Sequence, residues 1–198
     1  MLVSSIDAHQ HRHADHPVHD LFVRRWSPRA MSGQPLTEDE IHRLFEAARW
    51  APSSFNEQPW RFLYARRDTP AWPVFFDLLM DANKVWCARA GLLVLVLSRK
   101  TFSHNNKPNP VHIFDAGSAW VSLALQATEM GLVAHGMAGF DWNKARTALA
   151  VPDDFDLCAM FAVGRPGQVE DLPEPVRARE VPSGRKPIAE IAREGPFK

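Results

Sequence analysis

Two groups of basic side chains have the chemistry needed to bind a phosphate. In the stretch RRWSPR, Arg25, Ser27 and Arg29 alternate, and near the other end of the chain Arg185 and Lys186 follow a glycine in SGRKP. Guanidinium groups bind phosphate through two parallel hydrogen bonds, and a serine hydroxyl adds a donor. Either stretch taken alone also fits an ordinary solvated basic surface, so the assignment depends on the rest of the chain.

Two further stretches carry polar or glycine-rich residues between regular patterns. APSSFNEQPWRF (residues 51–62) places two prolines, two serines, an asparagine and a glutamine between a helical pattern and an apolar run. HGMAGFD (residues 135–141) places glycines where the backbone must approach another group closely. The first stretch is either a helix stop with a turn or the wall of a binding site.

The usual catalytic signatures are missing from the sequence. It contains no G-x-G-x-x-G, no P-loop, no G-x-S-x-G elbow, no H-E-x-x-H and no C-x-x-C. The histidines beyond the N-terminal segment are scattered. If the protein is an enzyme, we therefore expect a bound cofactor to carry the chemistry.

Composition indicates one soluble domain. The chain has 198 residues, 45% of them hydrophobic, and a formal net charge of zero, which gives no reason to expect binding to nucleic acid or to a membrane. The run AGLLVLVL is too short to span a bilayer. The two cysteines, Cys87 and Cys158, lie far apart and predict buried thiols in a reducing compartment, so we expect a cytoplasmic protein.

Hydrophobic periodicity predicts an alternation of helices and strands. Helices are expected at residues 17–27, with Pro17 in the first turn, and over residues 38–51, 73–90, 111–130 and 143–150. Thr37 and Glu40 form the pattern of a capping box. Strands are expected at residues 60–65, 91–98 and 156–164. Because no clean βαβ repeat is present, the pattern favours an α+β fold.

The two ends of the chain differ in composition from the middle. Residues 1–16 contain four histidines and read either as a flexible tail or as a metal site, since imidazole binds zinc and nickel. Residues 168–198 are rich in proline and charge, and predict an extended C-terminal arm that is disordered or lies across another surface. We therefore expect a tail over residues 1–16 and a single domain over residues 17–198 that includes this arm.

In order along the chain, R-x-S-x-R, P-S-S-x-N-x-Q-P-W, GMAGFD, AVGRPG and the late RKP resemble the pattern of the FMN-dependent nitroreductase family. The resemblance extends from about Val18 to Ile191. It implies a three-layer α+β sandwich of a mixed, mainly antiparallel sheet flanked by helices. It also implies a homodimer with FMN at the interface and with C-terminal segments exchanged between the subunits.

The resemblance assigns the first basic group to the cofactor. Arg25 and Arg29 would pair with the FMN phosphate, and Arg185 would add a third charge from the C-terminal loop. Ser27 and the backbone around Trp26 would contact the ribityl chain or the edge of the ring.

The family pattern places the remaining site residues around the flavin ring. Asn83 would bond the pyrimidine edge, although Trp86 stands where some relatives have a lysine. One group would approach from the other subunit and comprises Pro52, Ser53, Ser54 and Asn56. Another would run beneath the ring, with an N–H near N5, and comprises Met137, Ala138 and Gly139.

The activity implied by the resemblance is a ping-pong oxidoreductase reaction. NAD(P)H would give a hydride to the flavin, and a small acceptor such as a nitroaromatic, a quinone, an enone or a flavin would then take the electrons. No protein acid or base and no metal is required. The alternative is a flavin-binding dimer of the same fold with another role, namely dehalogenation, flavin cleavage or a non-catalytic sensor or partner function.

Overall fold

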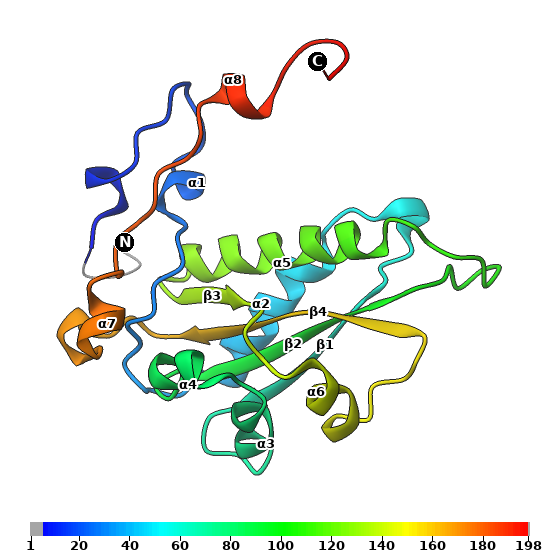
Figure 1. Ribbon diagram of the computed structural model, residues 1–198, viewed down its shortest axis with the longest axis horizontal. Helices are drawn as coiled ribbons and strands as arrows, with labels where there is room; N and C mark the ends of the chain where they lie inside the picture. Colours follow the sequence, from blue (N-terminus) through cyan, green and yellow to red (C-terminus); the bar gives the residue numbers. More distant parts are fainter. Residues whose placement is uncertain (1–5, 198) are drawn as a thin grey trace.

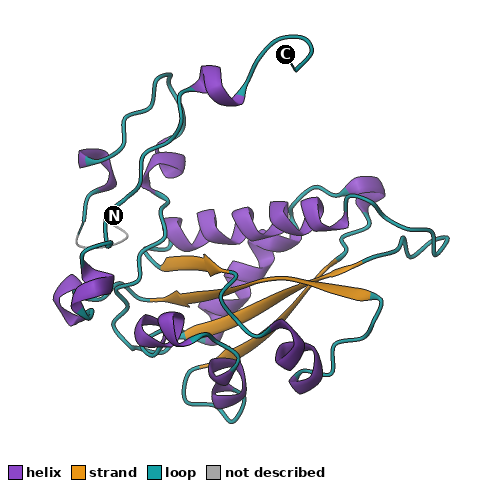
Figure 2. Ribbon diagram, in the orientation of Figure 1, coloured by secondary structure: helices purple, strands orange, loops and turns teal. Residues whose placement is uncertain are grey.

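The fold is a four-stranded sheet covered by helices on both faces (Figures 1 and 2). It is seen in a computed structural model that describes residues 6–197. The strand order is β1-β2-β4-β3, and every pairing within the described chain is antiparallel, so no parallel strand of the expected mixed sheet occurs there. The strands are β1 (Trp60–Arg66), β2 (Leu92–Arg99), β3 (Val133–Met137) and β4 (Phe155–Gly164).

The helices form the two outer layers. α2 (Glu38–Arg49) and α5 (His112–Glu129) pack on one face of the sheet. The other face carries α3 (Trp72–Asp77), α4 (Asp81–Cys87) and α6 (Trp142–Ala148). The shorter elements are η1 (Ala8–Gln10), α1 (Asp20–Arg24), η2 (Ser54–Asn56), η3 (Val169–Asp171), α7 (Glu174–Arg177) and α8 (Ile188–Ile191). This arrangement confirms the predicted three-layer α+β architecture.

β2 lies at the centre of the core, and this position explains why its sequence is apolar without interruption. Alternate residues of a strand face opposite sides of the sheet. Accordingly, Leu93 and Leu95 belong to the core beneath α3 and α4, whereas Val94 belongs to the core beneath α2 and α5. Both faces of β2 are therefore covered by helices.

Local signals set the ends of α2. The Thr37 side chain accepts from the Glu40 backbone N–H at 3.2 Å, and the Glu40 carboxylate accepts from the Thr37 N–H at 2.8 Å. This is the predicted capping box, which satisfies two of the backbone donors that a helix start leaves unpaired. The helix ends at Arg49, before Pro52.

The expected single helix over residues 73–90 is divided into α3 and α4, and this prediction was wrong. Between the two helices the backbone pairs with the segment after β3. The Met80 N–H donates to the Gly139 carbonyl at 3.0 Å, and the Asp141 N–H donates to the Leu78 carbonyl at 2.8 Å. Hydrogen bonds between segments distant in sequence replace the helical ones, and no local pattern signals them.

The start of the chain also differs from expectation. α1 begins at Asp20, with the His19 side chain accepting from the Leu21 N–H, so Pro17 lies outside the helix and not in its first turn. β3 was not predicted, because its short sequence VAHGM carries three polar or small residues and no clear alternation.

The terminal segments extend away from the layered body. Figure 1 shows the blue N-terminal segment running beside the orange and red C-terminal arm, which leads through α7 to α8. The arm exposes apolar side chains, among them Ile188 and Ile191. Within residues 6–197 both side chains keep a large part of their surface exposed.

Candidate functional site

A cluster of arginines lies where α1 ends. Arg25 follows the last residue of α1 in an extended conformation and is half-buried. Burial lowers its pKa, and the nearby positive charge of Arg185 lowers it further. The two arginines predicted from opposite ends of the sequence are therefore brought together by the fold.

Arg12 is the third member of this cluster, and the sequence analysis did not identify it. Burial and the charges of Arg185 and Arg25 lower the pKa of Arg12 to about 10. Within residues 6–197 none of the three guanidinium groups forms an ion pair with a carboxylate. Three close cations without a counter-ion form a site for an anion such as a phosphate.

Arg29 has a different environment from Arg25. Its Nη1 lies 3.6 Å from Oε2 of Glu180, and its backbone N–H donates to Oε1 of Glu180 at 2.6 Å. Glu180 comes from the C-terminal arm and is almost fully buried, and its Oε1 also accepts from the Ala30 N–H at 2.8 Å. The positive charge of Arg29 therefore already has a carboxylate partner. The expected contact between Arg29 and a phosphate stays a prediction.

The residues between Arg25 and Arg29 connect the arginine cluster to the core. Trp26 is 4% exposed, whereas Ser27 is partly exposed, with its Oγ 3.5 Å from Nη1 of Arg25. The pair therefore presents a hydroxyl next to the guanidinium and buries the indole.

His135 on β3 joins this loop to the sheet, and sequence reasoning also missed it. Its Nδ1 donates to the Pro28 carbonyl at 3.2 Å, and its ring centroid lies 4.5 Å from that of Trp86. Burial and the nearby charge of Arg29 lower the His135 pKa to about 4. The imidazole is therefore neutral at pH 7, and because a carbonyl only accepts, the proton lies on Nδ1.

Asn83 contacts Gly139, and Trp86 links this pair to His135. Asn83 Nδ2 donates to the Gly139 carbonyl at 2.9 Å, and Trp86 Nε1 donates to Asn83 Oδ1 at 3.3 Å. A Cβ at Gly139 would lie only 2.6 Å from Asn83 Nδ2, so the contact requires glycine.

Residues 136–139 comprise the end of β3 and the turn that follows it, and we call this segment the cradle. Gly136 and Ala138 are exposed, and Met137 between them is buried, as expected for alternating residues. A Cβ at Gly136 would lie 3.2 Å from the Trp120 ring of α5. The small exposed residues leave room for a flat molecule to approach the backbone.

The segment from Pro52 to Asn56 lies elsewhere. The Ser54 N–H donates to Asp115 Oδ2 at 3.2 Å in the first turn of α5, whereas Arg24 pairs with Glu129 at the last residue of α5. Fourteen residues separate those α5 positions, or roughly 21 Å of helix at about 1.5 Å per residue. In one chain this segment is therefore remote from the arginine cluster, and Figure 1 shows the two at opposite ends of α5.

This remote loop is held in an unusual backbone conformation. Phe55, Asn56 and Gln58 have positive φ angles of 51°, 54° and 50°. Ser53 stabilises it, because its Oγ accepts from the Gln58 N–H at 2.9 Å. Such conformations cost about 1 kcal/mol or more each and gather at binding sites.

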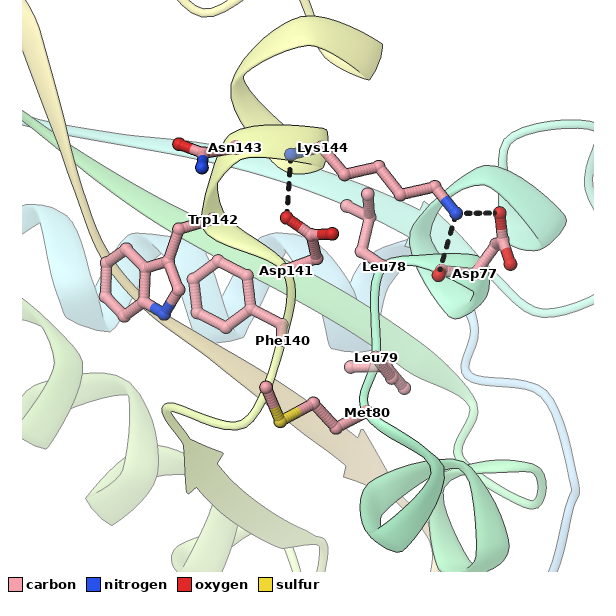
Figure 3. A pocket seen from close by; sticks show the side chains of 9 residues that line it. All are labelled: Asp77, Leu78, Leu79, Met80, Phe140, Asp141, Trp142, Asn143 and Lys144. Carbon is pink, nitrogen blue, oxygen red and sulfur yellow. Dashed lines mark hydrogen bonds and ion pairs between the residues drawn. The ribbon is translucent and has the colours of Figure 1, made fainter.

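Two other features of residues 6–197 do not form part of this site. Residues 77–80 and 140–144 line a cavity of about 440 Å³, in which Lys144 Nζ lies 2.5 Å from Asp77 Oδ2. Figure 3 shows Lys144 and Asp77 pointing toward one another, and the cavity contains none of the predicted site residues. The N-terminal histidines within this range join no group of three metal-ligating side chains.

Comparisons with known proteins identify what the chain as a whole is similar to. Residues 23–70 match the model of the Nitroreductase family. A Rhodopseudomonas palustris (strain TIE-1) protein, provisionally named NADH dehydrogenase/NAD(P)H nitroreductase, is 36% identical over 158 residues, which are 70% of this chain and 79% of that protein.

Solved structures extend the similarity to nearly the whole chain. The crystal structure of an oxidoreductase containing FMN is 45% identical with a TM-score of 0.91, and the match covers 94% of this chain and 96% of that one. A provisionally named nitroreductase from Desulfovibrio desulfuricans, solved in complex with FMN, is 27% identical with a TM-score of 0.71, covering 93% and 100%. In residues 6–197 no helix has the length and apolar character needed to cross a membrane.

Proposed function

The chain belongs to the nitroreductase family, and from this premise we propose that it is an FMN-dependent oxidoreductase that uses NAD(P)H to reduce a small organic acceptor. The observation that carries the proposal is the arginine cluster, which has no carboxylate partner among residues 6–197, since a phosphate group would supply the missing negative charge. The acceptor would be a nitroaromatic, a quinone, an enone or a free flavin.

The residues of the site fit FMN in both charge and shape. Arg25 and Arg185 would hold the phosphate. The exposed Ala138 and the partly buried Gly139 would lie against the ring, and Asn83 would stand at its edge. When bound, FMN supplies hydride acceptance from NAD(P)H and electron delivery to the acceptor.

In the proposed reaction, the residues of the protein bind the FMN and orient it. His135 stays neutral near pH 7 because its pKa is about 4, so it is a structural hydrogen-bond donor and no proton source. Its bond to the Pro28 carbonyl fixes the Arg25–Arg29 loop against β3. The proposal therefore needs no catalytic acid or base from the chain, in keeping with ping-pong exchange of substrates over one bound cofactor.

We propose a homodimer in which each site draws on both chains. The residues from Pro52 to Asn56 lie at the far end of α5 from Arg25, so a second copy is the source that would bring them to the same FMN. α5 also exposes Phe114 and Val121 on its outer face, and the C-terminal arm exposes Ile191. A partner subunit would bury these apolar groups, and the arm would cross onto it.

An absorption spectrum tests the proposed function directly. We expect the purified protein to carry, or to take up, a flavin band that bleaches when NADH or NADPH is added under argon. A bound flavin that stays oxidised with both nucleotides would contradict the NAD(P)H assignment. A protein that remains colourless after incubation with FMN would contradict the cofactor assignment itself.

A further inference from the structure

Arg12 connects the two segments that carry the phosphate-binding arginines. Its Nε donates to the Ser183 carbonyl at 2.8 Å, and its Nη1 donates to the Arg25 carbonyl at 2.7 Å and to the Val23 carbonyl at 3.1 Å. Ser183 lies two residues before Arg185. One side chain from the N-terminal segment thus bridges the end of α1 and the C-terminal arm.

We propose that Arg12 is a positioning residue that holds Arg185 beside Arg25 and so assembles the phosphate site. This inference rests on the proposed function, because the phosphate concerned is that of FMN. It gives a role to the segment before residue 16, which lies outside the matched family region of residues 23–70.

The chemistry of Arg12 suits this role. A planar guanidinium presents several donors in fixed directions, so it bonds carbonyl groups on two segments at once, which a lysine ammonium on a flexible stem does less well.

Electrostatic repulsion explains why the loop that carries Arg185 needs an attachment near Arg25. Burial lowers the pKa of Arg25, and repulsion between Arg25 and Arg185 lowers it further. Among residues 6–197, Arg185 itself bonds only groups close to it in the chain, namely the Ser183 carbonyl and hydroxyl and the Gly184 carbonyl. Without an outside attachment, the loop that carries Arg185 would move away from Arg25.

A second attachment keeps the rest of the arm in place when Arg12 is removed. Glu180 accepts from the Arg29 and Ala30 backbone N–H groups and is almost fully buried. We therefore expect Arg12→Ala to release only the part of the arm beyond Glu180 and to leave the fold intact.

The experiment compares the affinities of the apoprotein for FMN and for riboflavin, which lacks the phosphate, by quenching of flavin fluorescence. The variants are Arg12→Ala, Arg185→Ala and the double variant. Arg43→Ala on α2 is the control, since it removes one exposed positive charge at a distance from the cluster. We expect Arg12→Ala and Arg185→Ala each to weaken FMN binding by about tenfold to a hundredfold, with riboflavin binding unchanged.

The double variant identifies how Arg12 acts. If Arg12 positions Arg185, then in the Arg185→Ala background Arg12→Ala weakens FMN binding by less than about a further twofold. A full additional loss would mean that Arg12 acts independently of Arg185, and equal losses for FMN and riboflavin would mean a purely structural role; either result overturns the proposal. Should Arg12→Ala fail to fold, Arg12→Lys retains the charge without the fork and is expected to show the same selective loss.

Failure of the proposed function has a different signature. Wild-type protein that binds FMN no more tightly than riboflavin would refute the phosphate site itself and the role of Arg12 with it. Wild-type protein that prefers FMN, together with an Arg12→Ala variant that keeps the whole preference, would refute the positioning role alone.

Discussion

Replacement of Gly139 by alanine tests the contact between the cradle and α4. The added Cβ would lie 2.6 Å from Asn83 Nδ2 and 3.6 Å from Asn83 Cγ. Gly139 is absent from the residues with positive φ, so alanine introduces no backbone strain and the effect is purely steric. The Asn83 amide must therefore move away from the backbone.

The expected energy follows from the hydrogen bonds that this movement breaks. Asn83 donates to the Gly139 carbonyl at 2.9 Å and accepts from Trp86 Nε1 at 3.3 Å, and each neutral bond contributes about 1 kcal/mol. The Gly139 carbonyl keeps its bond from the Met80 N–H. Reduced freedom of the unfolded chain offsets roughly 0.4–1 kcal/mol. The net expectation is a loss of about 1 kcal/mol.

In an Asn83→Ala background the same substitution should have the opposite sign. The clashing amide is absent there, so Gly139→Ala should be neutral or stabilising by up to about 1 kcal/mol. The coupling between the two sites is then about 1–2 kcal/mol, typical of residues in direct contact.

Urea unfolding at a fixed protein concentration measures both effects. With a slope of about 2 kcal/mol per molar urea, Gly139→Ala should lower the midpoint by roughly 0.5 M in the wild-type background. Equal destabilisation in both backgrounds would show that Asn83 does not limit the space at Gly139, and the reasoning would fail.

Three further predictions concern pH, subunit sharing and the arm. The His135 pKa is lowered to about 4, so the neutral imidazole stabilises the fold above about pH 6.5, and this stabilisation is lost as the pH falls towards 4. The loss amounts to at most about 3 kcal/mol of the free energy of unfolding. The His135→Asn variant should not show this loss when urea unfolding is measured at several pH values. A heterodimer of one Arg25→Ala chain and one Asn56→Ala chain should bind one FMN with wild-type affinity in titration, because one site carries both changes and the other none; two weakened sites, each with one of the changes, would exclude sharing. Truncation after Gly167 should disrupt the dimer in sedimentation, and a stable, flavin-loaded dimer would contradict exchange of the arm.

Local sequence signals were sufficient for the elements whose partners are close in the chain. The capping box of Thr37 and Glu40 depends on groups three residues apart, and the apolar run of β2 reports its own burial. Helix α5 and strand β4 were predicted for the same reason, within two residues at each end. The family resemblance, carried by the order of short motifs, identified Arg25 and Arg185 as one group.

Tertiary structure decided where those elements break and which side chains meet. The division between α3 and α4 and the existence of β3 depend on hydrogen bonds to distant segments, which no local pattern encodes. Arg12 and His135 lie in stretches that the sequence analysis singled out for other residues, and they acquire their roles only because the fold brings the Ser183 and Pro28 carbonyls to them. Composition and periodicity describe what each segment prefers by itself; the partner of a guanidinium or an imidazole is set by the packing of the whole chain.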